Sequence, residues 1–105
     1  MRRLYVLLSK DIEPIYACVQ GGHAVAQWMM DNRETQGWNN EYLVYLYADL
    51  EKWSYKLKLM GRTFSSFREP DLDGKLTSIA LVDDGRLFRN LKTVKERVTN
   101  REIAS

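Results

Sequence analysis

The chain has 105 residues and a mass of 12.3 kDa, which is enough for one compact domain. Hydrophobic residues make up 45% and charged residues 29%, a globular balance that excludes a disordered tail and a collagen-like fibre. The single cysteine excludes an internal disulfide. The longest apolar run, residues 4–8, falls far short of the roughly 20 residues of a membrane span and ends too soon for a signal peptide. We therefore expect a cytoplasmic protein without a membrane segment.

The net charge of +2 is too small to indicate a nucleic-acid ligand by itself, but the charge is unevenly distributed. Residues 86–105 contain six basic and two acidic side chains, so this end carries +4 and the remaining chain −2. A basic end of this kind can contact phosphate groups. It can also be a solvated helix face or a frayed tail.

The first predicted elements are a strand and a helix. The nearly continuous apolar run at residues 4–8 predicts a strand that is buried on both faces. Pro14 suits the first turn of a helix, and helical spacing continues to about Met30. Positions three and four residues apart predict the buried face of this helix: Ile15, Val19, Gly22, Val25 and Met29.

The middle of the chain predicts a loop, a strand and a second helix. Residues 31–41 (DNRETQGWNNE) are polar and predict a loop in which Trp38 is exposed. Residues 42–47 (YLVYLY) carry the strongest strand signal of the chain. Asp49 is the expected N-cap of a helix that Gly61 ends. The buried face of that helix is predicted to contain Leu50, Trp53, Leu57 and Met60.

Two further strands, residues 62–68 (RTFSSFR) and 76–82 (LTSIALV), are separated by a short turn and should pair antiparallel. The element order is then β-α-β-α-β-β, followed by a weakly helical basic end from about residue 86. Strands that are each followed by a helix predict right-handed crossovers and parallel pairing. The sequence therefore predicts an α/β fold: a single domain, residues 1–105, with a mixed four-stranded sheet and helices on its faces.

The most unusual local feature is QGGHA, residues 20–24, inside the first helix. Two consecutive glycines there cost about 1 kcal/mol each relative to alanine, so a close approach of another backbone or of a ligand must compensate. Gln20 and His23 are three residues apart and therefore neighbours on one helical face. His23 is the only histidine and can donate, accept or transfer a proton near neutral pH. A surface or packed histidine is the alternative reading.

A second feature is the segment FREPDLDGKLT, residues 67–77. It places Glu69, Asp71 and Asp73 in a turn and Thr77 just inside the next strand. A carboxylate at a strand end can orient a water molecule, and a threonine hydroxyl can hold a polar substrate group. The same residues are also those that ordinary turns favour.

Other types of site have no support in the sequence. One cysteine and one histidine, without ligand spacing, indicate no metal site. No glycine-rich phosphate loop is present. Cys18 has no basic neighbours and is expected to be packed rather than nucleophilic.

Taken together, the two features resemble the Pth2-type peptidyl-tRNA hydrolases. In that family the first helix carries a K-x-A-x-Q-x-x-H-A pattern, a later turn supplies an aspartate, and the last core strand carries T-x-x-A. Residues 16–24 (YACVQGGHA) match the first pattern, and Asp71 with residues 77–80 (TSIA) matches the second. The resemblance covers most of residues 3–91. Two features depart from the family: Tyr16 replaces the lysine, and the segment between the aspartate and the threonine is shorter.

The resemblance implies hydrolysis of the ester that joins a peptide to the 3′ end of tRNA, with no metal or organic cofactor. Asp71, together with His23, would orient or deprotonate the water molecule, and Gln20 and Thr77 would donate hydrogen bonds to the substrate carbonyl or the terminal ribose. The substrate would also be bound by Tyr16, Arg68, Glu69 and Lys75. Arg62, Arg68 or Lys75 would supply the charge of the missing lysine.

The tRNA backbone would be held by the basic chain end and by three lysines of the second helix, Lys52, Lys56 and Lys58. The expected partners are thus tRNA or peptidyl-tRNA, and not a membrane, and a homodimer is left open. The main alternative is a non-catalytic protein of the same fold that binds tRNA, a peptide or a protein partner. A third is an unrelated α/β protein in which QGGHA only serves packing.

Overall fold

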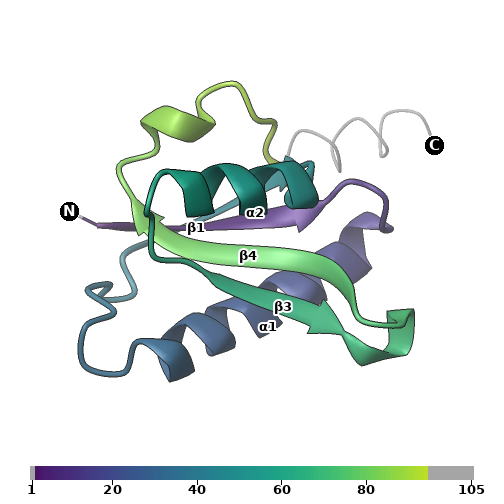
Figure 1. Cartoon of the computed structure of the whole chain (residues 1–105), viewed down its shortest axis with the longest axis horizontal. Coiled ribbons are helices and arrows are strands. Elements are labelled where there is room, and N and C mark those ends of the chain that lie inside the picture. The colour runs from purple at the N-terminus through teal and green to yellow at the C-terminus, as the bar shows by residue number, and fades with distance from the viewer. Residues whose placement is uncertain (1, 95–105) are drawn as a thin grey trace.

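The computed structural model describes residues 2–94, so residues 95–105, the second part of the predicted basic end, lie outside the described residues. Two helices, four strands and two short 3₁₀ turns follow one another along the chain (Figure 1). Their bounds are β1 Arg3–Ser9, α1 Pro14–Asp31, β2 Tyr42–Ala48, α2 Leu50–Leu59, β3 Ser65–Glu69, η1 Pro70–Leu72, β4 Lys75–Asp83 and η2 Arg86–Phe88. The element order agrees with the prediction, although β3 begins three residues later than expected.

The four strands form one mixed sheet in the order β2-β1-β4-β3. β1 and β2 are parallel, whereas β4 runs antiparallel to both β1 and β3. As predicted, β1 is buried on both faces: its side chains from Leu4 to Leu8 are at most 6% exposed. The described residues therefore form a single compact α/β domain, which confirms the predicted fold class.

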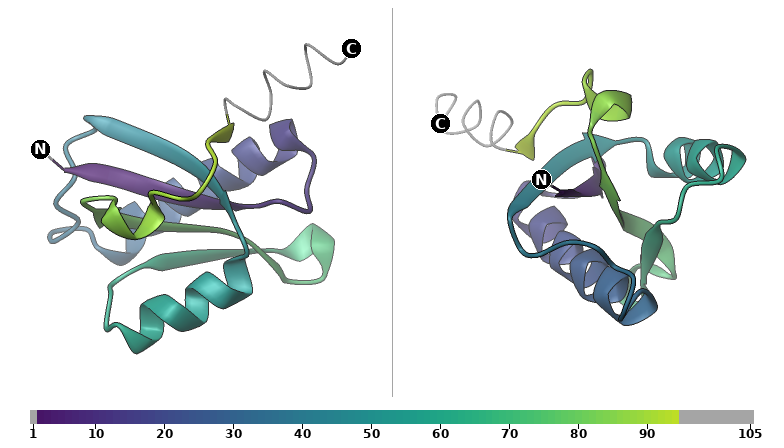
Figure 2. Two further views of the ribbon diagram at one scale, coloured as in Figure 1. Left: turned by 90° about the horizontal axis from the view of Figure 1, so that it is seen from above. Right: turned by 90° about the vertical axis from the view of Figure 1, so that its left-hand side faces the viewer.

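The two helices cover opposite faces of the sheet (Figure 2). The predicted buried face of α1 is wrong, because Ile15 and Val19 are 74% and 52% exposed. The helix instead turns a row of mainly small residues to the sheet: Ala17, Gln20, Gly21, Ala24 and Trp28. Small side chains allow the helix backbone to approach the strands closely, so this row rather than the larger apolar one is buried.

The glycine pair of α1 has two different surroundings. A β-carbon at Gly21 would lie 2.8 Å from the ring of Tyr45 and 3.0 Å from a methyl group of Leu8. A β-carbon at Gly22 would meet nothing within 4 Å. Of the two glycines in this pair, only Gly21 is therefore required by close packing.

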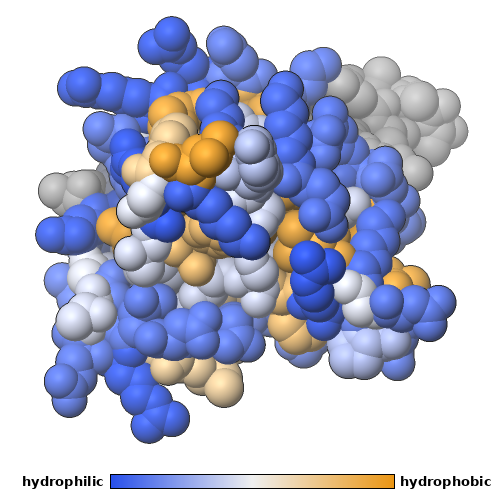
Figure 3. Space-filling model, viewed as in Figure 1, coloured by the Kyte–Doolittle hydropathy of each residue, from blue (hydrophilic) through white to orange (hydrophobic). Residues whose placement is uncertain are grey.

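α2 has the ends and the buried face that the sequence predicts, with one exception. The Asp49 side chain accepts a hydrogen bond from the backbone N–H of Lys52, and Gly61 follows the helix with a φ of +67°. The side chains of Leu50, Trp53 and Leu57 are buried, but Met60 is 40% exposed. On this side of the molecule, hydrophobic patches interrupt a largely hydrophilic surface (Figure 3).

The connection between α1 and β2 is anchored by a buried tryptophan. Trp38 was predicted to be exposed but is only 4% exposed. Its indole N–H donates to the carbonyl of Tyr42 (3.0 Å), and its backbone N–H and carbonyl both bond the side chain of Gln36. The sequence did not predict this burial because the loop is polar overall and a single aromatic residue provides its buried surface.

The last described residues return to the sheet. The backbone N–H of Tyr47 donates to the carbonyl of Lys92 (2.9 Å), and Leu46 forms an isolated antiparallel bridge with Thr93. This contact covers the end of β2, which is otherwise an edge strand. Within residues 2–94, no helix is long and apolar enough to cross a membrane.

Candidate functional site

The structure joins the two sequence features by a direct hydrogen bond. The hydroxyl of Thr77 in β4 donates to Oε1 of Gln20 in α1 at 2.8 Å. The hydroxyl of Ser78 donates to the backbone carbonyl of Gln20 at 2.7 Å. Gln20 is 1% exposed and Thr77 is fully buried, so the pair fixes α1 to the sheet.

A β-bulge places these two hydroxyls side by side. Phe67 pairs with Ser78 and Arg68 pairs with Leu76, which leaves Thr77 as the extra residue of β4. Successive residues of a regular strand point to opposite faces, and a bulge interrupts that alternation. Thr77 and Ser78 can therefore both face α1.

We expect removal of the Thr77 hydroxyl to destabilise the fold. Thr77→Val keeps the shape of the side chain but leaves the buried Oε1 of Gln20 without its donor. The free energy of unfolding should fall by about 1–3 kcal/mol, measured by urea denaturation. Thr63→Val, at an exposed threonine outside the strands, is the control and should change it little. A similar loss in both variants would contradict a specific role of the buried pair.

His23 lies one helical turn beyond Gln20 and does not point into the core. It is exposed, and its ring stacks on that of Phe67 in β3, with centroids 4.4 Å apart and an interplanar angle of 10°. The Phe67 ring covers one face of the imidazole and so holds its orientation. The two imidazole nitrogens, at the edge of the His23 ring, are not covered by this stacking. His23 is thus placed by β3 while remaining accessible.

Asp71 lies near the other end of this row, in η1 after the end of β3. It is exposed, whereas Glu69, two residues earlier, is only 7% exposed. Desolvation, followed by the negative charges of Glu69 and Asp71, raises the pKa of the Tyr16 hydroxyl above its ordinary value of 10.0. The Tyr16 side chain therefore lies in the electrostatic field of both carboxylates.

These residues form one row along α1 and the facing edge of the sheet. We call the set the α1–β3 site: Tyr16, Gln20, His23, Glu69, Asp71 and Thr77. Tyr16 and His23 are seven residues apart, about 10 Å along the helix. Asp71 lies at the Tyr16 end, and no hydrogen bond within residues 2–94 joins it to His23. A ligand that contacts both must extend along the row.

Arg68 and Lys75, predicted to bind the same substrate, lie elsewhere. Glu69 faces α1, so alternation along β3 turns Arg68 to the α2 side, where its guanidinium is 3.9 Å from Glu51. Lys75 is the cross-strand partner of Glu69, but its ammonium makes a 3.7 Å ion pair with Asp11. Arg62, the third candidate for the charge of the family lysine, is paired with Asp83. The prediction that one of these cations joins the α1–β3 site is therefore not supported.

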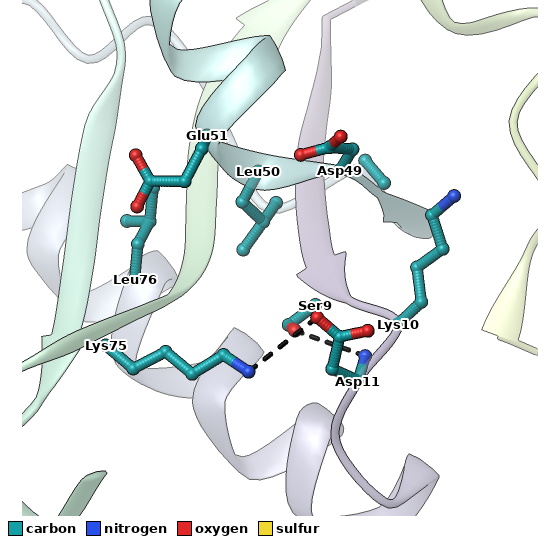
Figure 4. Close-up of a pocket in the computed structure, with 9 residues that line it drawn as sticks. Ser9, Lys10, Asp11, Asp49, Leu50, Glu51, Lys75 and Leu76 are labelled. Carbon is teal, nitrogen blue, oxygen red and sulfur yellow. Dashed lines mark hydrogen bonds and ion pairs between the residues drawn. The ribbon is translucent and has the colours of Figure 1, made fainter.

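Lys75 lines a hollow of about 320 Å³ that was not predicted from the sequence (Figure 4). It lies on the α2 side, beyond the carboxyl ends of β1 and β2, where ligands of open α/β sheets commonly bind. Its polar lining residues are Ser9, Lys10, Asp11, Asp49, Glu51 and Lys75. The signal in the sequence was the cluster of polar residues that directly follows each of two apolar strands.

Two other kinds of chemistry have no site among residues 2–94. No group of three or more histidine, cysteine or acidic side chains could hold a metal ion there. Cys18 is half-buried, and burial followed by the charge of Glu13 raises the pKa of its thiol. A raised pKa disfavours the nucleophilic thiolate, in agreement with the expectation that Cys18 is packed.

Comparison with known proteins identifies the fold but no family. No protein-family model matches the chain, and no curated protein matches it. A solved structure of a protein of unknown function from Agrobacterium tumefaciens is similar, with a TM-score of 0.66 and 13% sequence identity. The match covers 88% of this chain and 96% of that one. At this identity the likeness shows a shared fold alone.

Proposed function

We propose that this protein hydrolyses the ester bond between a peptide and the 3′ end of tRNA, as in the peptidyl-tRNA hydrolases that its sequence resembles. The observation that carries the proposal is the hydrogen bond between Gln20 and Thr77. It brings the Q-x-x-H-A and T-x-x-A patterns, 57 residues apart, into contact. His23 and Asp71 then lie at accessible positions along the same row.

Ester hydrolysis needs a positioned water molecule, an acceptor for its proton and a donor to the oxyanion. In this proposal Asp71 accepts the proton as the water oxygen attacks the ester carbonyl carbon. The tetrahedral intermediate then releases the ribose 3′ oxygen, which takes the proton from Asp71, and the peptide leaves as a carboxylic acid. Gln20 accepts from Thr77 through Oε1, and both residues are almost fully buried, so this pair would position α1, and the exposed imidazole of His23 would donate to the oxyanion. No metal or cofactor is required.

The tRNA backbone would be bound outside this site, because Glu69 and Asp71 are both acidic. Lys52, Lys56 and Lys58 are exposed on α2. The Lys56 ammonium lies 4.6 Å from the centre of the Trp53 ring, which orients it. Lysines arranged in this way contribute affinity without sequence specificity. A cytoplasmic location, where such a substrate would be met, is part of the proposal.

The test is hydrolysis of a purified N-blocked aminoacyl-tRNA by the wild type and by His23→Ala, each compared with a reaction without protein. Turnover by the wild type, reduced in the variant, is the expected result. Turnover that is equal in both would support the reaction and remove His23 from the mechanism. Absence of turnover above the protein-free control would contradict the proposal.

One observation favours a second function, a binding protein without turnover. Tyr16 occupies the position of the family lysine, and the structure supplies no replacement cation from Arg62, Arg68 or Lys75. The same experiment separates the two functions when binding is measured in parallel. Saturable, salt-sensitive binding of tRNA without hydrolysis would establish the second.

A further inference from the structure

We propose that a second hollow, at the opposite end of the sheet from η1, binds a phosphate group. This hollow has a volume of about 290 Å³ and lies between the end of α1, the loop that follows it and the start of β3. Its polar lining is formed by Arg2, Trp28, Asn32, Thr35, Gln36, Arg62 and Thr63. Trp28 is five residues beyond His23, about 7.5 Å along α1, and the hollow shares no lining residue with the α1–β3 site.

The charge of the hollow suits an anion. Two arginines, Arg2 and Arg62, line it, and none of the described lining residues is acidic. Asp83 neutralises part of this charge by pairing with Arg62. No ion pair within residues 2–94 involves Arg2, so its guanidinium can form the paired N–H···O bonds that phosphate oxygens favour.

A buried donor in the lining lacks a partner. Trp28 is 4% exposed, and within the described part of the chain its indole N–H has no acceptor. Buried donors are nearly always satisfied, so this N–H is an unusual feature of a residue that borders the hollow. The hydroxyls of Thr35 and Thr63, which are exposed residues of the lining, are donors that a phosphate oxygen accepts.

The negative end of the α1 dipole, which would oppose an anion, already accepts hydrogen bonds within the protein. Both the backbone and the side-chain N–H groups of Asn32 donate to the carbonyl of Trp28, at 3.1 and 2.9 Å. The nearby Asp31 carboxylate accepts hydrogen bonds from Gln27 and from Ser65. These bonds occupy acceptor atoms at this end of α1, while the Asp31 carboxylate keeps its charge.

The loop that forms one wall is held in place before any ligand binds. Trp38 is buried and bonds the side chain of Gln36 at both its backbone N–H and its carbonyl. Gly37 has a φ of +69°, and a β-carbon there would lie 3.1 Å from Nη1 of Arg2. The glycine therefore lets the Arg2 guanidinium lie against an ordered loop, which lowers the cost of binding.

Phosphate groups could come from an RNA backbone or from a free phosphate or nucleotide, and both use the chemistry described above. Phosphate binding at this hollow does not depend on ester hydrolysis, so it can hold where the proposed function fails.

The first experiment is thermal denaturation in increasing sodium phosphate, compared with sodium chloride at equal ionic strength. Saturable stabilisation by phosphate is expected, whereas a general salt effect does not saturate.

Arg2→Gln tests the site because Arg2 is exposed and its replacement should not disturb folding. The variant should bind phosphate about tenfold more weakly, the effect of losing one charged hydrogen-bond donor. Arg89→Gln, at an exposed arginine that does not line the hollow, should bind as the wild type does. Equal loss in both variants, or phosphate binding unaffected by Arg2→Gln, would overturn the proposal.

A short single-stranded RNA in the same assay distinguishes the sources of the phosphate. Tighter binding of the RNA than of inorganic phosphate, again weakened by Arg2→Gln, would assign the site to a nucleic-acid backbone. Stronger stabilisation by inorganic phosphate or a mononucleotide would assign it to a free ligand. No saturable effect of any of the three probes would show that the hollow is not a phosphate site.

Discussion

Asp71→Asn should lower the rate of ester hydrolysis by at least about 100-fold while leaving the free energy of unfolding unchanged. Removal of a general base typically costs a factor of about 10² to 10⁴. The asparagine side chain has the same shape but cannot accept the proton of the attacking water. Asp71 is exposed in η1 and makes no hydrogen bond within residues 2–94 that the substitution would break. The measurement is hydrolysis of an N-blocked aminoacyl-tRNA together with urea denaturation.

Asp73→Asn is a matched control in the same turn. Asp73 is also exposed, and its φ of +55° is one that asparagine adopts readily. Its hydrolysis rate should remain that of the wild type. Equal losses in the two variants would point to the charge of the whole turn, and a less stable Asp71→Asn protein would indicate a structural role.

Gly21→Leu should destabilise the protein by about 1–3 kcal/mol, because it forces a side chain into a closely packed contact. A β-carbon alone would lie 2.8 Å from the Tyr45 ring and 3.0 Å from Leu8. Leucine is a better helix former than glycine by about 1 kcal/mol, so a net loss must come from packing. Urea denaturation of the two proteins measures the difference.

Gly22→Leu provides the comparison at the next residue. Its β-carbon has open space around it, and the helix gains the propensity of leucine, so stability should be unchanged or slightly higher. Opposite effects at adjacent positions would confirm which side of α1 faces the sheet. A comparable loss at both positions would mean that the glycine pair is needed for another reason.

Part of the candidate site was predictable because it follows from element order. A first helix that crosses over between parallel strands must cover one face of the sheet, and β4 lies in its centre. Gln20 and Thr77 were therefore expected near each other, and their hydrogen bond is consistent with that expectation. Their nearly complete burial was not predicted, since it depends on how closely α1 approaches the strands.

The faces of individual elements were harder to predict. Ile15 and Val19 follow a helical period as well as Ala17 and Gly21 do, so hydrophobic spacing alone selected the wrong side of α1. Arg68 and Glu69 are adjacent in the sequence, but strand alternation sends them to opposite sides of the sheet. In β4, the bulge at Thr77 interrupts the alternation of side chains between the two faces, and no residue type in the sequence indicates a bulge.

The sequence by itself determined the α/β class, the order of the elements, the capped start of α2 and the buried central strand. These features depend on local preferences and on apolar runs that neighbouring residues contain. Three features could be seen only in the tertiary structure. Trp38 is buried and anchors its loop, the Lys75 ammonium pairs with Asp11 outside the α1–β3 site, and Arg2 and Trp28 line the same hollow. Such contacts join residues far apart in the chain, and close packing, which acts between elements, selects them.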